Sequence, residues 1–297
     1  MVGGILPDAD ILIQSPEDVL MVLDYHRNFT HALAFAPIGA LIAALLLWPL
    51  LRKHLGFPKT YLYSLTGYGA ACLLDACTSY GTHLWLPFSE RKEAWNLIAV
   101  FDPLFTVLLL LPLVLTLRRP RYRLAPVGLV FAAAYLGLGG WQYQRAEAAL
   151  REVVADRGHL ARDAVIKPTM ANQVLWRTLY VHEGRLQADA FHLGWKLRHY
   201  PGDSAPLMDQ AAESRLVGDH PRRREDLERF RHFADGFLIA DPARPDFVGD
   251  GRYAMLPTRI APIWGLEWSA EGAPAFVTFR EVTPEIRQAF VAMLLGR

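Results

Sequence analysis

The 297-residue chain has only two cysteines and a formal net charge of only +1. Cys72 and Cys77 lie five residues apart in an apolar segment. On a helix this spacing points the side chains in different directions, which argues against both a disulfide and a cysteine metal site. The near-neutral charge gives no support for nucleic acid binding. Residues 1–14 lack a basic region followed by a long apolar core, so we expect no secretory signal peptide.

Charged residues are almost absent from four segments that each approach the length of a transmembrane helix, about 20 residues. The segments are 32–51, 61–80, 94–117 and 124–144. The second contains only Asp75 and the third only Asp102 as charged residues. Basic residues at 52–59 and 118–123 separate the segments and are expected to face the cytoplasm. The sequence therefore predicts a multi-pass inner-membrane protein with its N-terminus and its C-terminal half on the extracytoplasmic side.

Acids and histidines gather at one predicted membrane face. These residues are Asp8, Asp10, His26, His31, Asp75 and Asp102. Ionisable groups at the end of a membrane segment are costly and usually line a polar cavity or meet a cation. Carboxylates and neutral imidazoles together suit zinc or manganese. A divalent metal site is one interpretation; the other is that each acid is solvated at the interface or paired with Arg27 or Arg91.

The spacing of the two histidines limits how they could share an ion. Positions five apart on a regular helix point about 140° away from each other. His26 and His31 therefore fit one ion only if His26 lies in a loop. We expect a helix to begin near Asn28 or Thr30, both favoured N-cap residues, with His31 in its first turn.

The C-terminal half is predicted to be a small α+β domain with antiparallel strands. Residues 174–199 alternate and are interrupted at His182-Glu183-Gly184, which is typical of a hairpin. Further strands are expected at 236–240, 252–256, 263–268 and 275–280, with helices at 222–235 and 284–295. The fold is then mainly α: a membrane domain of about four helices over 1–144, a helical linker over 145–170 and the α+β domain over 171–297.

Five motifs resemble one known family in their order and spacing across residues 5–117. They are Leu6–Asp10, His26–His31, Leu73–Thr82, Leu86–Ser89 and Asp102–Thr106. They are similar to the YdjM family of LexA-regulated, membrane-bound metal-dependent hydrolases of the bacterial inner membrane. Segments 174–177, 249–253 and 262–265 look like the C-terminal domain of its longer members. A distant similarity of the family to zinc-dependent phospholipase C implies a helical metal site and phosphoester hydrolysis.

The resemblance implies a particular set of metal-site residues. They are Asp8, Asp10, His26, His31 and Asp75, with Asp102 close by. Family members also tend to carry a histidine four residues before the acid of the second segment, where this chain has Ala71.

The leading hypothesis is a membrane-bound hydrolase of a phosphoester or other ester in a lipid or envelope metabolite. A divalent ion, zinc or manganese, would activate water, Arg27 would stabilise negative charge, and Asp102 or Asp10 would act as general base. One alternative is a non-catalytic membrane protein whose soluble domain binds a partner. Another is a transporter, which would place the acids deep in the spans and facing one another.

Overall fold

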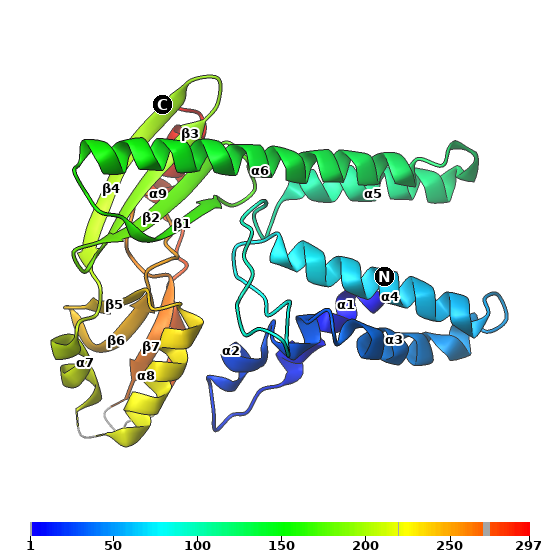
Figure 1. Cartoon of the computed structure of the whole chain (residues 1–297), viewed down its shortest axis with the longest axis horizontal. Coiled ribbons are helices and arrows are strands. Elements are labelled where there is room, and N and C mark those ends of the chain that lie inside the picture. The colour runs from blue at the N-terminus through cyan, green and yellow to red at the C-terminus, as the bar shows by residue number, and fades with distance from the viewer. Residues whose placement is uncertain (1, 219, 270–273) are drawn as a thin grey trace. The chain divides into compact units, whose positions relative to one another are not determined.

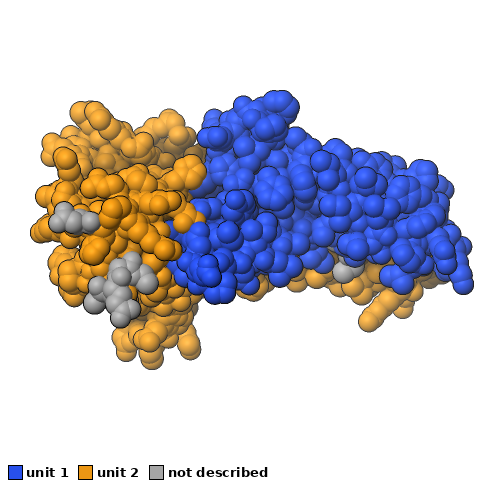
Figure 2. All heavy atoms as spheres, turned by 90° about the horizontal axis from the view of Figure 1, so that it is seen from below, with its two compact units in different colours: residues 1–95 blue, residues 96–297 orange. Residues whose placement is uncertain are grey.

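The computed structural model describes residues 2–218, 220–269 and 274–297. The chain divides into two compact units, Met1–Trp95 and Asn96–Arg297, which are coloured separately in Figure 2. The sequence predicts a domain boundary near residue 144. In the structure, the helices formed by the third and fourth uncharged segments belong to the same unit as the strands.

The first unit is helical (Figure 1). Its elements are α1 Val2–Ile5, the 3₁₀ helix η1 Leu6–Leu12, α2 Met21–Tyr25, the 3₁₀ helix η2 Phe29–His31, α3 Ala36–Leu51 and α4 Phe57–Ala76. Helices α3 and α4 lie side by side. Small residues on α3, Ala36 and Ala40, pack against Tyr68, Cys72 and Ala76 of α4. Small side chains on one helix let the large Tyr68 ring of the other fill the interface at high packing density.

The start of α3 differs from the expectation of a helix beginning near Asn28 or Thr30. Residues 29–31 form only one 3₁₀ turn, and α3 begins at Ala36 with a proline in its first turn. Pro37 has no N–H to donate and is favoured in a first helical turn, whereas in a helix interior its ring would clash with the preceding turn. The segment 26–31 is therefore irregular, which frees both histidines from the spacing of a regular helix.

The second unit combines two long helices with two antiparallel sheets (Figure 1). Its helices are α5 Pro103–Arg118, the 3₁₀ helix η3 Pro120–Tyr122, α6 Ala125–Asp156, α7 Gln210–Val217, α8 Pro221–Phe233 and α9 Pro284–Leu294. The first sheet has the order β1-β2-β3-β4 and the second the order β5-β6-β7-β8. Their strands are β1 Arg162–Pro168, β2 Leu175–His182, β3 Arg185–Leu193, β4 Leu197–Pro206, β5 Leu238–Asp241, β6 Arg244–Asp250, β7 Trp264–Trp268 and β8 Pro274–Thr278. The predicted combination of helices and antiparallel strands is confirmed.

Helix α6 is continuous from the last uncharged segment into the sheet. Its C-terminal half buries Ala146, Ala149 and Leu150 against Trp176 and Phe191 of the first sheet. The predicted hairpin is confirmed as β2–β3, which turns at two positive-φ residues between the strands. A residue pair with positive φ matches the twist of a tight hairpin.

One predicted strand is wrong. Residues 252–256 form no strand, and the paired strand is β6, which ends at Asp250. The chain then turns at Gly251, where an added Cβ would lie 2.7 Å from the Ile239 side chain. Arg252 folds back so that its guanidinium donates to Asp250. This local ion pair holds the turn and prevents the strand from continuing.

The four uncharged segments all form helices, α3 to α6. In the part of the chain that the structure describes, no single helix is both long and apolar enough to cross a bilayer. Met21–His31 and Ala36–Leu51 reach that length and apolarity only as a pair, with a 90° bend between them.

Candidate functional site

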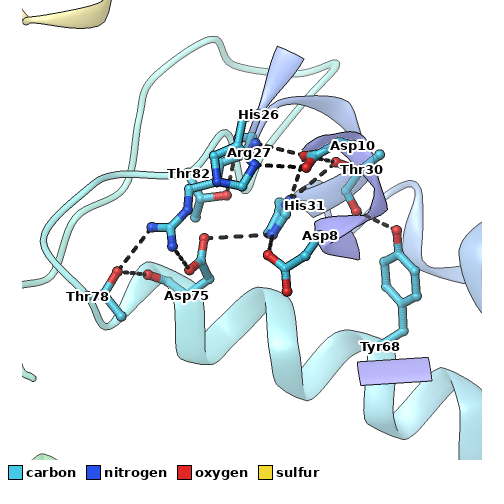
Figure 3. A network of polar contacts seen from close by, with 10 residues as sticks. All are labelled: Asp8, Asp10, His26, Arg27, Thr30, His31, Tyr68, Asp75, Thr78 and Thr82. Atoms are coloured by element: carbon cyan, nitrogen blue, oxygen red, sulfur yellow. Dashed lines mark hydrogen bonds and ion pairs between the residues drawn. The ribbon is translucent and has the colours of Figure 1, made fainter. Parts of the chain in front are cut away.

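Five of the predicted site residues meet within the first unit (Figure 3). Asp8 and Asp10 come from η1, His26 and His31 from the irregular segment before α3, and Asp75 from the last turn of α4. The 3₁₀ geometry of η1 has three residues per turn, so Asp8 and Asp10 do not point the same way. Asp10 is fully buried, whereas the Asp8 side chain is 57% exposed.

His31 lies at the centre of this cluster. Its Nδ1 atom is 3.4 Å from Oδ2 of Asp10, and its Nε2 atom is 3.5 Å from Oδ1 of Asp8 and 3.9 Å from Oδ2 of Asp75. Burial alone would lower the pKa of His31, but the carboxylates of Asp10 and Asp8 outweigh it and raise the pKa to about 9. The protein without metal therefore holds His31 as an imidazolium among three carboxylates.

Asp10 organises the segment that carries the two histidines. Its Oδ1 atom contacts Nδ1 of His26 at 2.8 Å. Its Oδ2 atom accepts from the Arg27 backbone N–H at 2.8 Å and from the Thr30 hydroxyl at 2.7 Å. Burial by itself would raise the pKa of Asp10, but these bonds and the histidines hold it well below its usual range. Both oxygens of Asp10 are thus engaged within the protein.

Arg27 has an unusual backbone conformation with φ at +62°. A non-glycine residue in this left-handed region is uncommon and is retained where the surroundings favour it. The turn points the Arg27 amide at Asp10 and its guanidinium at Asp75, whose Oδ1 atom is 3.0 Å from Nη2. Nη1 also donates to the Thr78 hydroxyl at 3.4 Å. Arg27 therefore connects two of the carboxylates that the chain brings together.

Whether the cluster can hold a metal ion depends on how its donor atoms are arranged. Among residues 2–218, 220–269 and 274–297, no group of three or more His, Cys, Asp or Glu side chains is arranged around a metal position. In the cluster, Asp8 Oδ1 and Asp75 Oδ2 both lie near His31 Nε2. Two ligands of one tetrahedral zinc ion lie about 3.4 Å apart, close to the 3.5 and 3.9 Å from His31 Nε2 found here. The buried Oδ2 of Asp75 also has no hydrogen bond within the described structure, which leaves this oxygen available to a cation.

Three further residues complete the cluster and were not singled out as site residues from the sequence. The Thr30 hydroxyl contacts both Asp10 and His31, the latter at 3.2 Å. The Tyr68 hydroxyl donates to the Thr30 carbonyl at 2.6 Å. Thr78 lies between Arg27 and the end of α4. Thr30 and Thr78 lie inside two of the recognised motifs, and that position is the signal that could have identified them.

Asp102 belongs to the second unit and has a different set of contacts. It is the N-cap of α5, where its Oδ1 atom accepts from the Phe105 N–H at 3.0 Å. Its Oδ2 atom accepts from the Tyr135 hydroxyl of α6 at 2.8 Å. A capping carboxylate of this kind satisfies a helix N–H that otherwise lacks a partner. These contacts fix α5 to α6.

Comparison with known proteins agrees with this pattern of residues. A model of the family described as "YdjM inner membrane protein" matches residues 1–146. Through these residues the chain belongs to the YdjM family. The YdjM match covers α1 to α5 and the apolar part of α6, and with them all the residues of Figure 3. The two antiparallel sheets lie beyond it, as expected for a long member of the family.

One curated relative extends the comparison beyond the family model. The uncharacterized protein YfhP of Bacillus subtilis (strain 168) is 25% identical over 200 residues. The match covers 65% of this chain and 56% of YfhP, so the chain spans little more than half the length of that relative. No solved structure matches the chain.

Proposed function

We propose that this YdjM-family protein is a metal-dependent hydrolase that works at the inner membrane. Its substrate would be a phosphoester or other ester of a lipid or envelope metabolite. The observation that carries the proposal is the approach of Asp8 and Asp75 to the same nitrogen, Nε2 of His31. Carboxylates from different elements repel one another unless a positive charge lies between them. In the protein without metal, protonated His31 and Arg27 supply that charge.

Asp8, His31 and Asp75 are the proposed ligands of the ion, zinc or manganese. Three protein ligands that leave one position open are typical of catalytic zinc sites. When bound, the ion supplies a Lewis acid and lowers the pKa of a coordinated water towards neutrality. Asp10 serves as a positioning residue, because a carboxylate on Nδ1 orients a metal-binding imidazole through its other nitrogen.

His26 is assigned to proton transfer. Its Nδ1 contacts Asp10, and its ring centre is 6.3 Å from that of His31. Two imidazoles on one tetrahedral ion have ring centres about 5 Å apart, so His26 fits the shared ion less well than His31. Its side chain is 34% exposed and can reach a substrate. An aspartate-held imidazole of this kind can act as a general acid or base.

Arg27 is assigned to binding the substrate anion. Its side chain is 15% exposed, and its guanidinium already pairs with one oxygen of Asp75. A guanidinium presents several donors in one plane, which suits both a carboxylate and a phosphoryl group. Arg27 can therefore hold Asp75 in place while donating to an anionic ester.

A non-catalytic role is the second candidate. It is supported by the ion pairs of Asp75 with Arg27 and of Asp10 with His26, which balance charge without a metal. In that case the cluster would stabilise the first unit, and the sheets of the second unit would bind a partner.

Metal content separates the two candidates. The full-length chain, purified in detergent and dialysed against zinc or manganese, is analysed for bound metal beside His31→Ala, Asp75→Asn and the exposed control His54→Ala. We expect stoichiometric metal in wild type and His54→Ala and loss in the other two variants. Hydrolysis of bis(p-nitrophenyl) phosphate should follow metal content. Wild-type protein that retains no metal would favour the non-catalytic candidate.

A further inference from the structure

The turn between β3 and β4 exposes the side chain of Trp195 completely, at 107% of its reference area. The next three residues, Lys196, Leu197 and Arg198, are also exposed. The turn and the first two residues of β4 therefore present an aromatic ring and an aliphatic side chain beside two cations, with no acid among them. Exposure of a Trp ring to water is unfavourable in free energy. A Trp beside basic residues is typical of a lipid headgroup region.

Hydrogen bonds hold the β3–β4 turn against helix α6 at Gln142 and Arg145. The Arg145 guanidinium donates to the carbonyls of Leu193 at 2.9 Å and Gly194 at 3.0 Å. Gln142 is buried and also donates to the Leu193 carbonyl, at 3.0 Å. Arg145 lies over the ring of Trp141, which is itself 55% exposed. Trp195 thus lies beside the point on α6 where Trp141 and Arg145 occur.

The loop between β1 and β2 reaches the same level of α6. Gln142 donates to the Gln173 carbonyl at 2.9 Å, so one amide side chain contacts both loops. The neighbouring Ala171 N–H donates to the carbonyl of Phe101 at 3.0 Å, just before α5. Phe101 and Met170 are 62% and 67% exposed. We call Phe101, Trp141, Met170 and Trp195 the collar.

The collar marks a change in what α6 exposes. On its N-terminal side α6 exposes Leu129, Val130 and Phe131. On its C-terminal side the exposed residues include Arg151 and Glu152. An exposed apolar surface that gives way to a charged one through a belt of aromatic residues has the pattern of a bilayer interface.

We propose that the collar lies in the headgroup region of the membrane and that the β3–β4 turn rests on the lipid surface through Trp195. Lys196, Arg198 and Arg145 supply positive charge for lipid phosphates, and their aliphatic stems lie along the apolar boundary. The first sheet is therefore held against the bilayer by its own turn as well as by α6. This inference depends on the membrane location and is independent of the metal chemistry.

Site-directed quenching tests the proposal in the full-length chain. Trp195→Cys is labelled with an environment-sensitive fluorophore and reconstituted into vesicles of phosphatidylethanolamine and phosphatidylglycerol that contain a headgroup nitroxide lipid. Leu160→Cys is the matched control, because Leu160 is 78% exposed in the turn that follows α6. That turn lies about 22 Å further along the helix axis than Gln142, by the rise of an α-helix. Cys72 and Cys77 are buried, and the unsubstituted chain provides the labelling blank.

We expect roughly twofold quenching with a blue-shifted emission at position 195, since belt residues sit at headgroup depth, and no quenching above the blank at position 160. Equal quenching at the two positions overturns the proposal. A blue shift at position 195 without nitroxide quenching indicates a protein contact and also overturns it. Metal content is measured in the same samples, so a chain that binds metal while position 195 stays unquenched refutes this inference alone.

Discussion

Oδ1 of Asp10 lies 2.8 Å from Nδ1 of His26, sixteen residues further along the chain. The other oxygen of the same carboxylate accepts from the backbone of the next residue, Arg27. A single buried side chain therefore fixes both an imidazole and the unusual turn that follows it. The shape of the site depends on this pair more than on any regular helix.

Removal of the Asp10 charge should destabilise the first unit. Asp10→Ala removes the carboxylate that His26 and the Arg27 N–H contact, and breaking such a buried pair costs about 3 kcal/mol. Asp8→Asn is the matched control; its side chain is 57% exposed, so we expect a change within about 1 kcal/mol. Thermal unfolding of the metal-free chain in detergent measures both. Equal midpoints for the two variants would contradict the central role of Asp10.

The stability of the metal-free protein should fall as the pH rises from about 6.5 to about 9. The pKa of His31 is raised from 6.5 to about 9 in the folded state. A raised pKa means that protonation favours the folded state, so the contribution is complete below pH 6.5 and is lost as pH rises through 9. Unfolding midpoints measured over this range should decline in wild type and stay flatter in His31→Gln. A decline of the same size in the variant would assign the effect to another group.

Metal binding should release a proton near neutral pH. His31 must give up its Nε2 proton before that nitrogen can bind an ion, and its pKa lies above 7 in the metal-free protein. Calorimetric titration with zinc in buffers of different ionisation enthalpy measures the number of protons released. We expect about one at pH 7 and none at pH 10. A release that does not depend on pH would mean that His31 is not a ligand.

A methyl group added at Gly39 should disturb the site around His31 indirectly, by displacing Tyr68. An added Cβ would lie 2.2 Å from Cε2 of Tyr68, whose ring is fully buried and whose hydroxyl donates to the Thr30 carbonyl. Gly39→Ala should cost about 1–3 kcal/mol as an overpacked core. Gly69→Ala is the control, because no described atom lies within 4 Å of the added group. There the better helix propensity of alanine should leave stability unchanged or raise it by up to about 1 kcal/mol, as thermal unfolding will show.

Removal of a second buried carboxylate, that of Asp189, should destabilise the first sheet. Asp189 is fully buried, accepts two bonds from the Arg157 guanidinium at 2.7 and 2.8 Å, and contacts His199 at 2.7 Å. Asp189→Ala should destabilise the second unit by about 3–5 kcal/mol. Glu147→Gln breaks an exposed pair with Arg151 and should cost less than about 1 kcal/mol. Denaturant unfolding compares them; a small effect at Asp189 would show that the network is dispensable.

The sequence was sufficient to predict which residues of the first unit come together. Asp8, His31 and Asp75 share one predicted membrane face, and the family motifs contain all three. The helices in the uncharged segments and the β2–β3 hairpin also followed from pattern, because each depends on local composition. What the pattern could not reveal was which atoms are already engaged within the protein. Oδ1 of Asp10 contacts the His26 ring, and Oδ2 accepts from the Arg27 amide and the Thr30 hydroxyl. Only the folded backbone brings these groups together.

Two differences have the same cause. Asp102 looked like a spare carboxylate, yet it caps α5 and accepts from Tyr135. Residues 252–256 looked like a strand, yet Arg252 turns back to Asp250. In both cases a charged side chain contacts a partner that the tertiary structure brings close. Local sequence propensity contains no information about that partner.

Helix α6 runs unbroken from Ala125 to Asp156, which corresponds to about 48 Å at the rise of an α-helix. Its first half exposes apolar side chains, and its second half packs against the first sheet. Such a rod has no hinge at which motion can be absorbed. Any rotation of its apolar end is therefore transmitted to the whole first sheet.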